Sequence, residues 1–317
     1  MEYLKNFLLY WKRLAIVCLP LFALYYWFGS LELEPATEDH QTVSEEEVRM
    51  IIDSVFHAVS KGELEKALTF ADQWVTTNPS STYANANRAG FKNDLGDFKG
   101  AYVDADKAVQ LDSMFFLGYI NRGAASENLG NLEQAVIDYT TYIKLVPDTV
   151  DGYMRRGKAY KKLKRHADAI QDYTMAIAID SNYVEAYFQR GVNKNSLGEY
   201  FDALQDFNTV TNIGWMEGSG ELTVTRDMPV HANRAFSKAN LGWYGAALAD
   251  MEIALFVDTA NPVLYDIRGD INHAAGDKYG ACQDWLKALN LSGDDEYKQK
   301  LEENCGKVTE TRIPVES

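Results

Sequence analysis

An arginine that precedes a small residue occurs six times in this chain, and an aspartate stands at position i+16 after each arginine at position i. The pairs are Arg88 with Asp104, Arg122 with Asp138, Arg156 with Asp172, Arg190 with Asp206, Arg234 with Asp250 and Arg268 with Asp284. Successive pairs are evenly spaced, and only the interval between Arg190 and Arg234 is longer. The common interval corresponds to a period of about 34 residues, which is typical of helix-turn-helix repeats that bury their apolar faces against their neighbours. The sequence therefore predicts an all-α solenoid.

Small residues follow the same period. Alanine recurs in every repeat, at Ala67, Ala101, Ala135, Ala169, Ala203, Ala247 and Ala281. We expect these alanines to face the small residues that follow the arginines, where two antiparallel helices approach closely. Glycine recurs between the two predicted helices, at Gly62, Gly96, Gly130, Gly198, Gly242 and Gly276, and Lys164 replaces it once. A left-handed backbone is expected there, because it costs glycine least.

The periodic positions divide the chain into seven predicted repeats. They span 48–81, 82–115, 116–149, 150–183, 184–217, 228–261 and 262–295. The connection before the sixth repeat is longer than the others, which predicts an insertion loop at 213–230. Loops of this length are often functional, although surface insertions are also tolerated at little cost. Residues 296–317 are expected to form a capping helix and a tail, because a terminal repeat otherwise exposes its apolar face.

The segment YINRGAASENLGNLEQAVIDYTTYIKLVPD at 119–148 resembles a tetratricopeptide repeat (TPR). The resemblance extends over residues 48–295 and implies a right-handed superhelix. It also implies that the first helix of each repeat lines a concave groove that binds a segment of another protein. No catalytic activity or cofactor is implied.

The arginine and aspartate columns are predicted to form structural ion pairs within each repeat. The first repeat has Ser54 in place of the arginine and Phe70 in place of the aspartate, so both partners are missing together. Joint loss is expected of a pair, because removing one partner of a buried ion pair costs about 3–5 kcal/mol.

The residues just before these arginines are predicted to point into the groove and to bind the partner. They are Asn87, Asn121, Arg155, Gln189 and Asn233. Lys158 and Lys162 follow Arg155 at helical spacing, so the fourth repeat is expected to add a cationic centre that suits an acidic segment. The asparagines and Arg155 match three places of the carboxylate clamp found in some TPR proteins, but Tyr83 and Asp151 stand where the clamp has lysines. A merely solvated basic helix is the alternative.

The N-terminus has the composition of a membrane anchor. Residues 14–31, LAIVCLPLFALYYWFGSL, carry no charge and are long enough to span a bilayer as a helix. Basic residues in segment 1–13 predict that this end is cytoplasmic. The acidic linker 32–47 and the repeats are then expected outside the cytoplasm, most plausibly in a bacterial periplasm. A cleaved signal peptide and a cytosol-facing co-chaperone that binds an acidic C-terminal peptide are the alternatives.

Charge and residue counts exclude other classes of function. With 46 acidic against 31 basic residues, the net charge of −15 disfavours a nucleic-acid partner. The five histidines form no metal-spaced pair, and no catalytic motif or phosphate loop is present. We therefore expect no enzyme, metal, cofactor or small-molecule substrate. Cys282 and Cys305 are either a disulfide that fastens the capping helix or two packed thiols.

Overall fold

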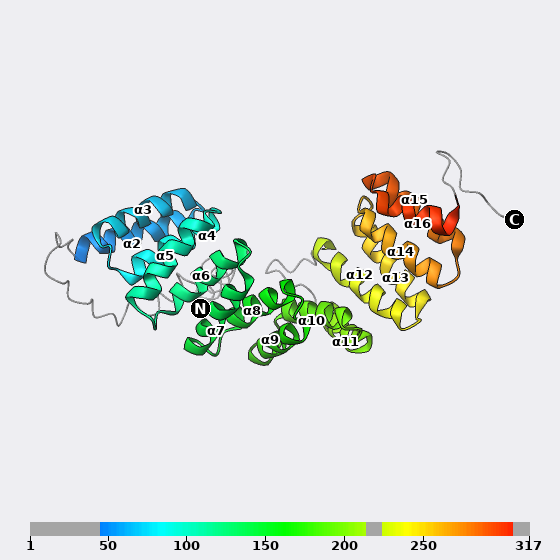
Figure 1. Ribbon diagram of the computed structural model, residues 1–317, viewed down its shortest axis with the longest axis horizontal. Helices are drawn as coiled ribbons and strands as arrows, with labels where there is room; N and C mark the ends of the chain where they lie inside the picture. The colour runs from blue at the N-terminus through cyan, green and yellow to red at the C-terminus, as the bar shows by residue number, and fades with distance from the viewer. Residues whose placement is uncertain (1–44, 214–223, 307–317) are drawn as a thin grey trace, which may run out of the picture. The chain divides into compact units, whose positions relative to one another are not determined.

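The computed structural model describes residues 45–213 and 224–306, and this part of the chain is entirely helical (Figure 1). The prediction of an all-α repeat fold is confirmed. The proposed membrane segment 14–31 lies outside the described residues. Among the helices that are described, none combines the length and the apolar character needed to cross a membrane.

The chain divides into two compact units, residues 1–165 and 166–317. The described helices of the N-terminal unit are α2 (Glu45–Ser60), α3 (Leu64–Thr77), α4 (Thr82–Asp94), α5 (Phe98–Leu111), α6 (Phe116–Asn128), α7 (Leu132–Leu145) and α8 (Val150–Lys162). Those of the C-terminal unit are α9 (His166–Ile179), α10 (Val184–Ser196), α11 (Tyr200–Ile213), α12 (Val224–Asn240), α13 (Tyr244–Val257), α14 (Pro262–Ala274), α15 (Lys278–Ser292) and α16 (Asp295–Cys305). The division falls between α8 and α9, inside the predicted fourth repeat.

The turns within the hairpins have the expected left-handed backbone. The six periodic glycines have φ between 72° and 88°, and Lys164 has φ of 59° in the one turn that lacks glycine. A positive φ ends the first helix and starts the reversal of the chain, and glycine adopts it without a steric penalty.

Three glycines on the first helices lie against aromatic rings of the second helices. A Cβ added to Gly123, Gly191 or Gly269 would lie 2.7–2.8 Å from a ring carbon or nitrogen. The rings are those of Tyr139, Phe207 and Trp285 respectively. In these three repeats the ring, and not the periodic alanine, makes the nearest contact, which differs from our expectation. Each ring belongs to the residue four positions after a periodic alanine, so it lies on the same face of the second helix and reaches further across the hairpin.

Two boundaries differ from the predicted ones. Helix α2 begins at Glu45, inside the predicted linker. Helix α12 begins at Val224 and contains Pro229, so the second part of the predicted loop 213–230 is helical. Pro229 is the sixth residue of α12 and has no N–H, so the helix lacks one backbone hydrogen bond there.

Helix α16 packs on α15 as a cap. Tyr297 and Leu301 are buried, and the sulfurs of Cys282 and Cys305 form a disulfide across a Cα–Cα distance of 5.9 Å. Lys300 adds ion pairs of 2.6 Å to Asp266 and 3.0 Å to Asp270 on α14. The open end of the C-terminal unit is thereby covered.

Candidate functional site

The structure brings five of the six arginine–aspartate pairs into contact. The Nη2–Oδ1 distances are 2.6 Å for Arg88 and Asp104, 2.7 Å for Arg122 and Asp138, 2.7 Å for Arg190 and Asp206, 2.5 Å for Arg234 and Asp250, and 2.6 Å for Arg268 and Asp284. In each pair Nε also donates to the carboxylate, so the contact is bidentate, and each aspartate is buried. Arg156 and Asp172 belong to different units, and their pairing stays a prediction.

Each of four arginines also contacts the preceding repeat, which the sequence analysis missed. Nη1 donates to a side chain 16 residues earlier, with distances of 3.2 Å from Arg88 to Asp72, 2.6 Å from Arg122 to Asp106, 3.1 Å from Arg156 to Thr140 and 3.1 Å from Arg190 to Thr174. A polar residue stands 16 positions before each of these four arginines, and this second periodic pattern could have revealed the contact. In three of these repeats one guanidinium therefore joins the two helices of its own repeat and links that repeat to the one before.

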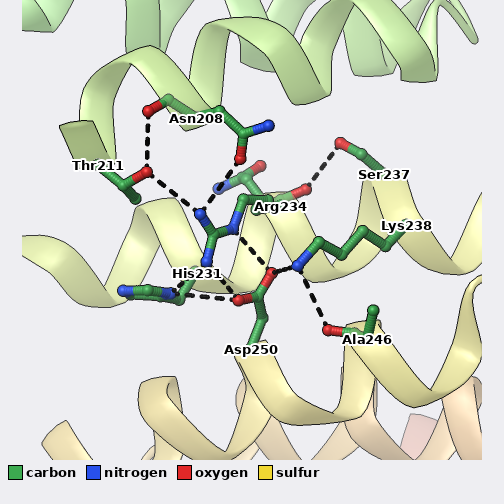
Figure 2. A network of polar contacts seen from close by, with 9 residues as sticks. Asn208, Thr211, His231, Arg234, Ser237, Lys238, Ala246 and Asp250 are labelled. Carbon is green, nitrogen blue, oxygen red and sulfur yellow. Dashed lines mark hydrogen bonds and ion pairs between the residues drawn. The ribbon is translucent and has the colours of Figure 1, made fainter.

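The sixth repeat preserves this link despite the insertion. Figure 2 shows Arg234 between α11 and the Asp250 carboxylate of α13. Its Nη1 donates to Asn208 Oδ1 at 3.3 Å, across 26 residues, and to Thr211 Oγ1 at 3.2 Å. The inserted residues account for the longer separation, so the two repeats keep the usual contact while the connection between them lengthens.

A lysine one turn after the arginine supports the same carboxylate in three repeats. Lys92, Lys194 and Lys238 lie 2.8, 2.9 and 2.7 Å from Asp104, Asp206 and Asp250. In the sixth repeat His231 also approaches Asp250, at 3.5 Å (Figure 2). Burial by itself would raise the pKa of Asp250, but hydrogen bonds from His231, Arg234 and Lys238 lower it overall.

The amides predicted to bind a partner are engaged within the fold. Asn87 and Asn121 are buried, and their Nδ2 atoms donate to the carbonyls of Tyr83 and Ala86 at 2.8 Å each. The bond from Asn121 to Ala86 joins α6 to α4. Burial leaves Asn87 and Asn121 little surface for a partner, which corrects their predicted role.

The other two amides are also hydrogen-bonded. Asn233 Nδ2 donates to the Pro229 carbonyl at 2.7 Å, and Gln189 Nε2 donates to Glu185 Oε1 at 2.7 Å. Both side chains are half-buried, so part of each surface can still meet a partner.

Arg155 and Lys162 of α8 belong to a network of ion pairs and hydrogen bonds. Nε of Arg155 lies 2.9 Å from each Asp151 oxygen, and the guanidinium hydrogen-bonds with Tyr139. Burial opposes the charge of Arg155, but Asp151 and Tyr139 raise its pKa overall. Arg155 was expected to be part of a cationic centre in the groove. The structure pairs it with Asp151, which lies one helical turn before it.

Lys162 is also part of this network. Its Nζ lies 2.7 Å from Glu127 Oε1, and Glu127 Oε2 accepts the Tyr139 hydroxyl at 3.0 Å. Lys158, one turn after Arg155, is exposed to solvent. In residues 45–213 and 224–306 no group of three or more His, Cys, Asp or Glu side chains is arranged to hold a metal ion.

Comparison with known proteins supports the architecture. A family model described as "Tetratricopeptide repeat" matches residues 150–183, and no curated protein matches the chain. A tetratricopeptide repeat protein from Parabacteroides merdae ATCC 43184 is 22% identical in sequence, with a TM-score of 0.56 over 80% of this chain and 97% of its own. The APC/C hetero-tetramer Cut9-Hcn1 contains a chain with 16% identity and a TM-score of 0.59, over 78% of this chain and 47% of that chain.

MamA of Desulfovibrio magneticus RS-1 is 16% identical, with a TM-score of 0.50 over 54% of this chain and 97% of its own. At such low identities these three likenesses are of fold alone. The family match gives the fourth repeat the same bounds as the periodic spacing of the arginines. Together, the repeated hairpins, the family match over the fourth repeat and the solved structures show that the chain has the fold of tetratricopeptide repeat proteins.

Proposed function

We propose that the protein is a non-catalytic scaffold that binds an acidic segment of another protein along the first helices of its repeats. The fold supports binding of a protein or peptide, because TPR hairpins generally serve as scaffolds for protein–protein interaction. In this chain, ion pairs and packed rings hold the two helices of a hairpin together without a partner. A preformed surface of this kind binds with little loss of conformational freedom.

The observation that carries the acidic partner is the placement of Arg155. Asp151 and Tyr139 hold its guanidinium in one orientation, while 38% of its side chain stays exposed. Asp151 takes the Nε hydrogen and Tyr139 accepts another, and a guanidinium has five N–H donors in all. A partner carboxylate gains charge-assisted hydrogen bonds there without having to order the side chain. Lys158 supplies a second positive charge one turn along α8.

The test is site-specific photo-crosslinking from α8 in native membranes, followed by mass spectrometry. The variant Arg155→Gln/Lys158→Gln should lose the crosslinked partner and keep the helical circular-dichroism spectrum of the unaltered chain. The control variant Lys107→Gln/Lys144→Gln removes two exposed charges from second helices and should retain the partner. Equal capture by both variants would contradict the proposal.

We further propose that residues 14–31 anchor the protein in a membrane with the repeats outside the cytoplasm. The Cys282–Cys305 disulfide supports this location, because disulfides persist in oxidising compartments. Protease added to intact cells, or to cells with a permeabilised outer membrane, should digest the repeats. Protection until the inner membrane is broken would favour the cytosol-facing co-chaperone instead.

A further inference from the structure

Exposed aromatic side chains gather in the C-terminal unit. Among the side chains that the structure describes, all exposed phenylalanines, tryptophans and tyrosines lie there: Phe201 (56% exposed), Phe236 (43%), Trp243 (47%), Phe256 (83%) and Tyr279 (59%). Single exposed apolar residues need no explanation, but a cluster of them marks an interaction surface. We name Phe201, Phe236, Trp243 and Tyr279 the aromatic edge, because they belong to one side of three successive hairpins.

The repeat register places these four residues at the turn end of three successive hairpins. Phe201 and Tyr279 are the second residues of α11 and α15, and Trp243 immediately precedes α13 in the hairpin between them. Phe236 on α12 lies against Tyr200, the first residue of α11, with 6.0 Å between ring centroids. Successive hairpins pack side by side, so equivalent positions follow one another along the edge.

The N-terminal unit shows that the fold itself does not require aromatic residues here. The positions equivalent to Phe201 and Tyr279 are Lys99 and Glu133. Asp97 and Asn131 are equivalent to Trp243, and Gly90 and Ala124 to Phe236. Both sets of hairpins form with the same turns and ion pairs. The aromatic edge is therefore an addition to the repeat pattern, and 43–59% of each of its residues is exposed to water.

Acidic residues surround the aromatic edge. Glu199 and Asp202 flank Phe201, Asp277 precedes Tyr279 by two residues, and all three are exposed. Lys278 is an exposed base beside them, whereas Lys194 and Lys238 are held by Asp206 and Asp250 at 2.9 and 2.7 Å. The charge around the aromatic edge favours a cationic partner and repels anionic lipid headgroups.

We infer that the aromatic edge docks an apolar segment of a second protein that is flanked by lysine or arginine. Aromatic rings pack against aliphatic side chains and also attract cations over their faces, so both features of such a segment are recognised. This surface lies in the C-terminal unit and uses neither Arg155 nor Lys158 of α8. It is independent of the function proposed above.

The test measures binding of a labelled amphipathic peptide of leucine and lysine to the full chain by fluorescence anisotropy, at about 0.15 M salt. Phe201→Gln/Trp243→Gln/Tyr279→Gln should weaken binding about tenfold or more, because buried aromatic residues dominate interfaces. The matched control is Leu95→Gln/Leu129→Gln, which removes exposed apolar residues from the same edge of the N-terminal unit. It should bind like the unaltered chain.

Three outcomes would overturn the inference. In the first, the triple variant and the control bind the leucine–lysine peptide equally well. In the second, the unaltered chain binds a leucine–glutamate peptide as tightly as the leucine–lysine peptide, and in the third it binds lipid instead of the peptide. Lipid binding would appear as co-sedimentation with phosphatidylglycerol vesicles that the triple variant loses. If the triple variant fails to fold, peptide binding is measured with Glu199→Gln/Asp202→Asn instead. This variant keeps the rings and should weaken peptide binding about threefold through lost attraction. Unchanged affinity would show that the acidic residues around the aromatic edge do not attract a basic segment, which overturns the inference.

Discussion

Removing Arg122 should destabilise the N-terminal unit more than removing Arg88, although both arginines occupy the same place in neighbouring repeats. Asp138, the partner of Arg122, is 0% exposed, and its other hydrogen bond is a 3.3 Å contact from Gln134. Asp104, the partner of Arg88, keeps an ion pair of 2.8 Å with Lys92. Arg122→Ala therefore leaves a buried carboxylate without a cation, whereas Arg88→Ala does not.

The expected losses follow from this difference. Leaving a buried charge unpaired costs about 3–5 kcal/mol, so Arg122→Ala should fall in that range. Arg88→Ala loses charge-assisted hydrogen bonds worth about 1.5–3 kcal/mol. The contacts of the two arginines with the more exposed Asp72 and Asp106 contribute about 0–1 kcal/mol each and nearly cancel in the comparison. The difference in the free energy of unfolding should be about 2 kcal/mol, a roughly thirtyfold change in the unfolding equilibrium.

Urea denaturation followed by circular dichroism gives the free energies. Hydrogen exchange of amides in α4–α7 gives the loss within the N-terminal unit itself, since repeat arrays can unfold in parts. Lys92→Ala in the Arg88→Ala background should abolish the difference, and Lys99→Ala on the exposed face of α5 should have no effect. Equal losses for Arg122→Ala and Arg88→Ala would refute the reasoning.

Three further predictions concern packing, the cap and acid stability. Gly191→Ala should cost about 1–3 kcal/mol, because the new Cβ would lie 2.8 Å from the Phe207 ring, and Phe207→Leu should recover part of this loss in a thermal melt. Reducing the Cys282–Cys305 disulfide should lower the stability of the cap by about 3 kcal/mol, measured as exchange of α16 amides with and without dithiothreitol; no change would mean that α15–α16 packing suffices. The pKa of Asp250 is lowered in the folded state, so its contribution is complete above its unfolded pKa of about 3.9 and is lost as the pH falls below it. Urea midpoints between about pH 6 and 3 should therefore fall less steeply for Asp250→Asn, and parallel curves would contradict this.

The sequence alone was enough to predict the hairpins, because the residues that form them recur from one repeat to the next. The period identified two helices in each repeat, the glycines marked the left-handed turns, and the joint absence of arginine and aspartate from the first repeat predicted their pairing. These inferences succeed because each depends on residues within one repeat, where spacing along a helix nearly determines which side chains can meet.

Only the tertiary structure showed which contacts the periodic residues make with neighbouring repeats. Spacing did not show that Nη1 of Arg122 reaches Asp106 in the preceding repeat, or that Asn121 is buried against the carbonyl of Ala86. Nor did it show that Asp151 pairs with Arg155, since that depends on the side-chain rotamers adopted beside Tyr139. A repeat pattern describes one hairpin, whereas burial and charge pairing depend on the surfaces that neighbouring hairpins present to each other.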